Sequence, residues 1–206
     1  MNLESLLNSI INDPDYLENL AYGKPRKGHP EGSVGAHVAQ LEENIGKLHG
    51  VLASLDSGLA LSPKLKLELK IVAHVHDSFK AQAAKRVPIA DPRSHASLAR
   101  VFLARFTNDD RLLSLVQNHD VPYSLYQNYL RFGDVNEPRL QSLIDQVKDW
   151  DLYMWFQVID NTLPGKLDPA REGPVAWFAG LMEDRLALGS HFRQAHEMMK
   201  RALFAG

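Results

Sequence analysis

The sequence predicts an all-α protein that forms one domain. Apolar residues recur at helical spacing along most of the 206-residue chain, and runs of alternating β-branched residues, which are typical of strands, are nearly absent. The length suits a single domain, and a composition of 45% apolar and 23% charged residues is typical of a packed globular protein. We therefore expect one helical bundle over residues 1–206.

Five helices are expected in the first half of the chain. A stripe of apolar residues runs from Val34 to Leu52 at intervals of three or four positions, which predicts a long amphipathic helix. The pair Asp13-Pro14 combines a capping residue with a proline of the first turn, which is a typical helix start. The expected helices are 3–11, 15–22, 33–55, 63–77 and one that begins at the similar pair Asp91-Pro92.

The second half of the chain is expected to hold five more helices. Leu112 and Leu115 mark one face of a short helix, and we expect Pro122 to end it. A loop is expected at 133–138, and Gly189 separates the last two helices. The expected helices are 111–119, 123–132, 139–163, 175–188 and 190–204.

The composition argues against several classes of protein. The formal net charge is -2, so no overall positive field favours nucleic acid or an anionic membrane surface. The absence of cysteine excludes disulfides, thiolate metal ligands and a cysteine nucleophile. No window approaches the ~20 apolar residues of a membrane-spanning helix, and the first residues do not resemble a signal peptide. A cytoplasmic location is therefore the expectation.

Polar residues that commonly bind metals interrupt the apolar faces of the expected helices. His76 continues the face of Leu69 and Val72, and Asp160 lies one turn after Phe156. A single histidine on such a face is most often a hydrogen-bonded core residue, but a carboxylate there is costly unless it is paired or binds a metal. Several such residues in one small domain together predict a metal centre with nitrogen and oxygen ligands. The candidate ligands are His37, His76, Asp77, His95, His119 and Asp160.

The order of these residues resembles that of the HD-domain metal-dependent phosphohydrolases. Members of that family have a histidine on an early helix, an adjacent His-Asp pair and a late aspartate, here His37, His76-Asp77 and Asp160. The segments GHPEGSVGAHV and HDSFK are also similar to segments of the family. The resemblance extends over about residues 28–166 and implies a helical bundle of the HD type.

The resemblance also concerns the number of metal ions. His95 and His119 match positions at which two-metal members carry additional ligands, which implies two ions with Asp77 as the bridging ligand. The alternative is a single ion, with His95 and His119 binding the substrate phosphate or donating a proton. The expected metals are Mn, Fe, Mg, Ni, Co or Zn.

The implied reaction is hydrolysis of a phosphate ester or anhydride, and the expected substrate is a phosphorylated small molecule such as a nucleotide or a related metabolite. A bound metal ion lowers the pKa of its water and polarises a phosphoryl oxygen. We assign catalysis to Asp77 and Lys80, because Lys80 lies one turn after the His-Asp pair and can neutralise charge on the phosphoryl group. The alternative for Lys80 is a solvated surface residue.

Three further basic residues are candidates for binding the substrate. Lys27 and His29 belong to the loop 23–32, which precedes the helix of the first ligand, and Arg93 lies two residues before His95. A solvated loop and an ordinary surface arginine are the alternatives.

Two other functions remain open from the sequence. Some HD-fold proteins that resemble the two-metal branch, such as myo-inositol oxygenase, use two iron ions to activate oxygen. A ligand-sensing or partner-binding domain with a structural metal is the third interpretation. Tyr123 and Tyr126 are candidates for a nucleobase pocket, although aromatic residues at helical spacing more often pack a core. A homodimer is compatible with the sequence, which carries no strong signal for nucleic-acid binding.

Overall fold

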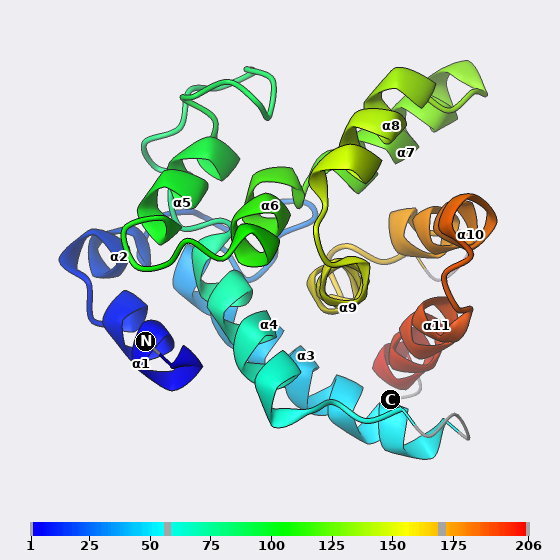
Figure 1. Ribbon diagram of the computed structural model, residues 1–206, viewed down its shortest axis with the longest axis horizontal. Helices are drawn as coiled ribbons and strands as arrows, with labels where there is room; N and C mark the ends of the chain where they lie inside the picture. Colours follow the sequence, from blue (N-terminus) through cyan, green and yellow to red (C-terminus); the bar gives the residue numbers. More distant parts are fainter. Residues whose placement is uncertain (1, 56–58, 169–171, 205–206) are drawn as a thin grey trace.

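The computed structural model describes residues 2–55, 59–168 and 172–204, and these residues form an all-helical protein (Figure 1). Within these ranges no β-strand occurs, and the only β-type pairing is an isolated bridge between Arg26 and His29. None of the helices in the described ranges has the length and apolar character needed to cross a membrane. The helices are α1 (Leu3–Ile11), α2 (Pro14–Asn19), α3 (Val34–Ser54), α4 (Pro63–Val75), α5 (His95–Leu103), α6 (Asp110–Asn118), α7 (Val121–Phe132), α8 (Glu137–Gln146), α9 (Trp150–Asn161), α10 (Pro174–Leu186) and α11 (His191–Phe204).

Most of these helices begin where a side chain caps the first turn. Ser33 and Ser94 accept hydrogen bonds from backbone N–H groups three residues later, and Asp149 does the same for α9. Proline occupies the first turn of α2, α4, α7, α8 and α10, where its missing N–H group leaves no intrahelical bond unmade. The local sequence therefore determines where these helices begin.

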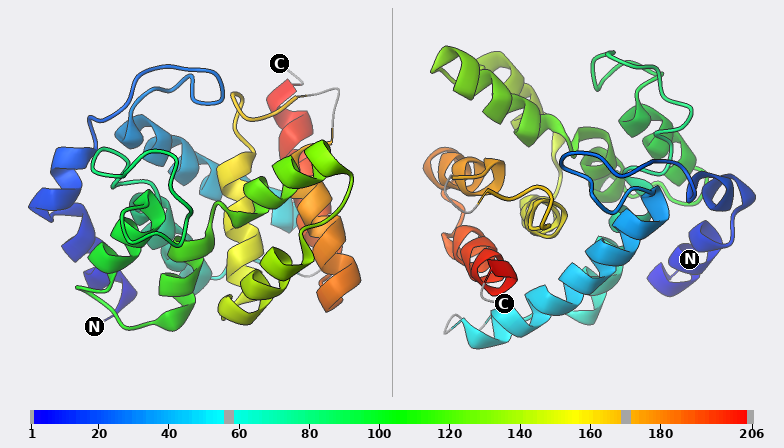
Figure 2. Two further views of the ribbon diagram at one scale, coloured as in Figure 1. Left: turned by 90° about the horizontal axis from the view of Figure 1, so that it is seen from above. Right: turned by 180° about the vertical axis from the view of Figure 1, so that it is seen from behind.

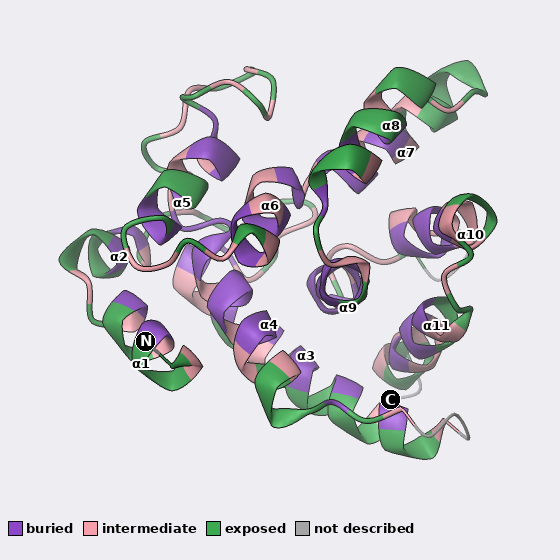
Figure 3. Cartoon of the chain, viewed as in Figure 1, coloured by how far each residue is buried: buried purple, intermediate pink, exposed green. Residues whose placement is uncertain are grey.

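Helix α9 is the central element of the fold. Nine consecutive residues, from Leu152 to Asp160, are buried, so this stretch of α9 presents no face to solvent (Figure 3). Its neighbours include α3, α4, α10 and α11, which come from both halves of the chain (Figure 1). A helical stretch that is buried on all sides needs neighbouring helices on each face, because every face must be removed from water.

The remaining helices pack in pairs around this centre. α3 lies beside α4, α5 packs on α6, α1 packs on α4, and α7 packs on α10. One hydrophobic cluster unites most of the buried residues of these helices. Its largest fully buried side chains are Tyr153, Phe156, Phe178 and Phe192. The all-helical class expected from the sequence is therefore confirmed.

Two loops meet at one end of the bundle. The loop between α2 and α3 passes the start of α3 and approaches the loop that follows α9 (Figure 2). Gly165 in the second loop has no room for a Cβ atom, which would overlap the ring of Pro30 in the first loop. A side chain at position 165 would therefore force the two loops apart.

The expectation of one helix over 139–163 is wrong. Helices α8 and α9 occupy this segment, and the backbone of Val147 between them is extended. Asp149 caps α9 by accepting a hydrogen bond of 3.0 Å from the backbone N–H of Leu152. Apolar spacing continues across the interruption, so periodicity does not reveal it, whereas Asp149 is a recognisable capping residue.

Two expected helix boundaries are also wrong. The Asp91-Pro92 pair lies in a turn, and α5 begins later, at His95. Pro122 does not end a helix but lies in the first turn of α7, which begins at Val121. Asp91 caps no helix but accepts a hydrogen bond of 2.8 Å from the backbone N–H of Arg93 in that turn, and Pro122 begins a helix rather than ending one.

Candidate metal centre

The structure brings together all six residues that the sequence predicts as metal ligands. They form two groups of three, and within each group the candidate ligand atoms lie within 4.8 Å of one another. The first group is His37 near the start of α3, His76 directly after α4 and Asp160 at the end of α9; the second is Asp77, His95 at the start of α5 and His119 directly after α6.

Three helices direct their C-terminal ends at this cluster. His76 and His119 are the C-cap residues of α4 and α6, and Asp160 lies in the last turn of α9. The last carbonyl groups of a helix lack intrahelical partners and give this end a partial negative charge. These three helix ends therefore favour a cation, whereas the starts of α3 and α5, which carry His37 and His95, oppose it.

Backbone carbonyl groups determine how His76 and His119 face the cluster. Nδ1 of His119 lies 2.8 Å from the carbonyl oxygen of Val116, and Nδ1 of His76 lies 3.1 Å from that of Ala73. Because a carbonyl oxygen only accepts, Nδ1 carries the hydrogen in both rings. Nε2 of each ring is thereby left to face the carboxylates, and in the neutral imidazole it is a metal ligand.

The first group is compact and buried. Nε2 of His37 lies 3.2 Å from Oδ1 of Asp160, and Nε2 of His76 lies 3.8 Å from the same oxygen. No more than 6% of any of these three residues is exposed to solvent. Two imidazole nitrogens and a carboxylate oxygen around one point suit transition metals such as Zn, Mn or Fe.

The carboxylate of Asp77 lies between the two groups. Oδ1 is 3.6 Å from Nε2 of both His95 and His119, whose Nε2 atoms are 3.2 Å apart. Oδ2 is 3.4 Å from Nε2 of His76 and 3.9 Å from Nε2 of His37. Each oxygen of Asp77 therefore faces a different pair of histidines, and the carboxylate can offer one oxygen to each of two ions.

Several candidate ligand atoms are buried without a hydrogen-bond partner, as expected of residues that bind a metal ion. Nε2 of His37, Nε2 of His76 and Oδ1 of Asp77 are buried and make no hydrogen bond. Such atoms cost about 1–3 kcal/mol each when they are left without a partner. All three are ligand atoms of the two groups, so metal ions would satisfy them, and the residues present fit a metal site.

Two lysines neutralise the aspartates of the cluster. The ammonium group of Lys80 contacts Oδ2 of Asp77, and Nζ of Lys166 lies 2.8 Å from Oδ1 of Asp160. Burial alone would raise the pKa of both carboxyl groups, but the two ammonium groups hold each pKa well below its usual range. Both aspartates are therefore ionised at neutral pH, as metal ligands must be. Lys166 is not among the site residues expected from the sequence.

Asp120 is another residue of this site that the sequence analysis missed. Its carboxylate lies 3.2 Å from Nε2 of His95 and 3.7 Å from Nε2 of His119. Burial alone would lower the pKa of His119, but Asp120 and Asp77 raise it to about 9. A metal ion must therefore displace a proton to bind His119 at neutral pH. The dipeptide His119-Asp120 repeats the pair His76-Asp77, and this repetition is the signal that identifies Asp120.

Glu31 lies beside the first ligand, His37, but outside the two groups. Its Oε1 lies 2.8 Å from Nδ1 of His29 and 3.3 Å from Nδ1 of His37, where the alignment falls short of a hydrogen bond. A carboxylate beside Nδ1 favours a hydrogen on that atom and leaves Nε2 free for a metal. Glu31 is not among the expected site residues, although it lies in the segment GHPEGSVGAHV that also contains His37.

Polar side chains also tie the ligand-bearing helices to one another. Asn44 on α3 donates hydrogen bonds of 2.9 and 2.8 Å to the carbonyl oxygens of Ile159 and Thr162 at the end of α9. Gln157 on α9 donates a bond of 2.9 Å to the carbonyl oxygen of His119. Side chains of neighbouring helices thus satisfy helix-end carbonyl groups that water would otherwise bind. These hydrogen bonds hold α3, α6 and α9 in register.

A cavity of about 610 Å³ opens beside the metal centre. Asp77, His119 and Asp160 form part of its wall, and Tyr123 and Tyr126 line it further out along α7. The volume lies within the usual range for sites that bind small molecules. Three of the six candidate ligands are therefore accessible to a substrate from this cavity.

The predicted substrate-binding residues divide between this cavity and the surface. Lys27, His29 and Lys80 all line the cavity. Arg93 is not among the lining residues, and its side chain is 71% exposed and forms an ion pair of 2.9 Å with Asp91. The structure therefore brings three of the four residues to the metal centre.

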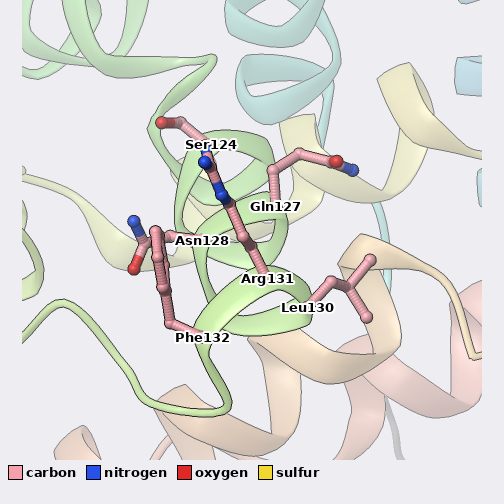
Figure 4. Close-up of a pocket in the computed structure, with 6 residues that line it drawn as sticks. All are labelled: Ser124, Gln127, Asn128, Leu130, Arg131 and Phe132. Atoms are coloured by element: carbon pink, nitrogen blue, oxygen red, sulfur yellow. The ribbon is translucent and has the colours of Figure 1, made fainter.

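A second hollow, of about 480 Å³, lies on the outside of α7 (Figure 4). All of its lining residues belong to that one helix: Ser124, Gln127, Asn128, Leu130, Arg131 and Phe132. None of them is a candidate metal ligand or lies in either group of three. This hollow is therefore not the candidate site.

Comparison with known proteins leaves the family undetermined. No protein-family model matches the chain, and no curated protein or solved structure is significantly similar to it.

Proposed function

We propose that this protein is a metal-dependent phosphohydrolase of the HD type. The observation that carries the proposal is the position of Asp77, whose two oxygens face different pairs of histidines. A carboxylate between two ions 3.5 to 4 Å apart is a common feature of two-metal hydrolases. The sequence order of His37, His76-Asp77 and Asp160 supports the same family.

The proposed site holds two metal ions, and Asp77 contributes to both. Bound metal supplies a water of lowered pKa and polarises a phosphoryl oxygen. The first ion would be held by His37, His76 and Asp160, and the second by His95 and His119.

The basic residues of the cavity would bind the phosphate group. Lys80 and Lys166 already lie against Asp77 and Asp160, so their ammonium groups are next to the ligands. Lys27 adds a third positive charge to the cavity wall. Together they would neutralise the charge that develops on the phosphoryl oxygens. A phosphorylated small molecule such as a nucleotide suits this wall and the exposed ring of Tyr123. A cytoplasmic location and a homodimer remain predictions.

The two alternative functions are less well supported. A purely structural metal needs a closed coordination shell, whereas here the cavity reaches Asp77, His119 and Asp160. An oxygenase would use the same ligands. The cavity wall contains three lysines and five carboxylates, so two bound divalent ions would make its net charge positive and favour an anionic substrate.

The decisive experiment combines metal analysis with phosphate release. The protein, purified without chelator, should contain two ions per chain and release phosphate from phosphomonoesters or nucleotides with Mn or Mg. Asp77→Ala should lose metal and lower turnover at least about 100-fold, the upper range for removing a residue that only orients a ligand. Circular dichroism should remain that of the unaltered protein, because Asp77 lies outside the helices.

A double variant tests the number of ions. His95→Ala with His119→Ala should reduce the content from two ions to one, while His49→Ala, at an exposed position of α3, should keep both. A single ion in the unaltered, metal-replete protein would refute the two-metal site. Oxygen consumption by iron-loaded protein without phosphate release would identify an oxygenase instead.

A further inference from the structure

A third hollow, of about 350 Å³, adjoins the second group of metal ligands. His95 forms part of its wall. It shares the lining residues Asp120 and Tyr123 with the large cavity, so the two spaces adjoin at this pair. A substrate that extends past this pair would reach from the metal centre into the hollow.

Two arginines line this hollow, and neither is neutralised by a carboxylate. Arg86 comes from the loop between α4 and α5, and Arg139 comes from the first turn of α8. No ion pair joins either guanidinium to an acidic residue of the described chain, unlike Arg93 or Arg105, which bind aspartates. The only carboxylate in the wall is Asp120, which already lies beside His95. The hollow is therefore a place where an anion would find unused positive charge.

The backbone around Arg86 is strained and anchored. Its φ is +61°, a left-handed conformation that non-glycine residues adopt at a cost of the order of 1 kcal/mol. The loop is held on both sides, because the N–H of Ala84 donates to the carbonyl of Arg93 at 2.9 Å and Gln117 donates to the carbonyl of Ile89 at 2.9 Å. Arg86 is thus held over the hollow by a loop whose position is fixed.

We propose that this hollow binds a second phosphate group of the substrate through Arg86 and Arg139. The inference rests on the proposed phosphohydrolase activity and narrows its substrate class to molecules that carry two phosphate groups. One phosphate lies at the metal centre beside Lys80 and Lys166. The other is bound by the two guanidinium groups, whose planar N–H donors suit phosphate oxygens.

A binding experiment tests the hollow without any need for activity. Metal-free, ¹⁵N-labelled protein is titrated with inorganic phosphate, and the Nε–H resonances of the arginine side chains are followed by NMR. The resonances of Arg86 and Arg139 should shift saturably, whereas that of Arg100, which is exposed on α5, should not. The double variant Arg86→Gln with Arg139→Gln, checked for folding by circular dichroism, should weaken phosphate binding at least about tenfold. The absence of a saturable shift at Arg86 and Arg139 overturns the proposal.

A kinetic experiment on the metal-loaded protein tests the substrate class. The same double variant should raise the KM for adenosine 3′,5′-bisphosphate at least about tenfold and change that for p-nitrophenyl phosphate less than about twofold. The control Arg100→Gln removes one positive charge at an exposed position and should alter neither KM value. Equal effects on both substrates overturn the proposal. If no phosphoester is hydrolysed, the proposed function fails, and the NMR titration alone then decides whether the hollow binds phosphate.

Discussion

At the level of single residues, the candidate metal centre has a lysine beside each of two carboxylates, Asp77 and Asp160, that a metal ion would bind. Nζ of Lys166 lies 2.8 Å from Oδ1 of Asp160, and that same oxygen is the one nearest to Nε2 of His37. The ammonium group of Lys80 contacts Asp77 in a corresponding way. Each lysine thus neutralises an aspartate that an ion would also bind, so lysine and metal compete for the same carboxylate.

Replacing Lys166 with an uncharged residue of similar length should separate these effects. Lys166→Met removes the competing charge, and we expect the dissociation constant for the metal to fall at least about tenfold, since nearby charges interact strongly at a partly buried site. The KM for a phosphate ester should rise, because the cavity loses a cation. A chelator competition titration measures the first effect and steady-state kinetics the second. Lys47→Met, at an exposed position, is the control; unchanged metal affinity in Lys166→Met would argue against competition.

The six candidate ligands could be picked out in the sequence because each interrupts or directly extends a helical face. Asp160, for example, ends the buried stretch of α9 from Leu152, in which Gln157 is the one other polar side chain apart from the Tyr153 hydroxyl, so its carboxylate requires a partner. Lys166, Asp120 and Glu31 lie outside such faces, in loops or at the junction of two helices, where periodicity carries no information. Their approach to the cluster depends on how distant helices pack.

At the level of helices, most of the elements followed from local sequence, and the exceptions have a common cause. Apolar spacing predicted α1, α3, α10 and α11 to within a few residues. It failed at Val147, where the chain turns extended between α8 and α9 without a change in composition. Periodicity indicates which residues face the core but not whether the helix is interrupted, and only a cap such as Asp149 reveals the interruption.

The packing of α11 on α9 depends on a buried histidine and should make the stability of the fold depend on pH. Nδ1 of His196 lies 2.8 Å from the hydroxyl oxygen of Thr162, and burial lowers the pKa of His196 from 6.5 to about 4. As the pH falls through 6.5, the unfolded chain takes up a proton at this residue, but the folded protein does not until about pH 4. The free energy of unfolding therefore decreases over this window.

The variant His196→Asn, which keeps a side-chain N–H donor, tests this dependence. Between pH 7 and pH 5 the free energy of unfolding of the wild-type protein should fall by about 2 kcal/mol because of His196, since the interval from pH 6.5 to pH 5 contributes about 1.36 kcal/mol per pH unit. In the variant the free energy of unfolding should fall by about 2 kcal/mol less over the same interval. Urea unfolding at the two pH values measures the difference. His49→Asn, which changes an exposed histidine, should follow the wild-type protein; the same behaviour in His196→Asn would show that His196 is not the cause.

At the level of the whole molecule, the candidate metal centre joins segments that are distant in the sequence. Its candidate ligands lie on or directly beside α3, α4, α5, α6 and α9. These helices pack on one another, and the starts of α3 and α5 and the C-terminal ends of α4, α6 and α9 carry the ligands. The fold class followed from composition and periodicity, because any chain with this pattern must bury its apolar faces between helices. The assembly of the site did not follow from them, because it requires the register of five separate segments.

Because the centre links these five segments, metal binding should stabilise the entire fold rather than one loop. At a free metal concentration about 100 times the dissociation constant, each ion that binds only the folded state adds about 2.7 kcal/mol to the free energy of unfolding, so two ions add about 5 kcal/mol. For a chain of this length that corresponds to a rise in Tm of roughly 10 to 20 °C. Differential scanning calorimetry of metal-saturated and chelator-treated protein measures the rise, and Asp77→Ala should abolish it. If metal analysis finds the sites occupied but the Tm does not change, the ions must bind somewhere other than the junction of α3, α4, α5, α6 and α9.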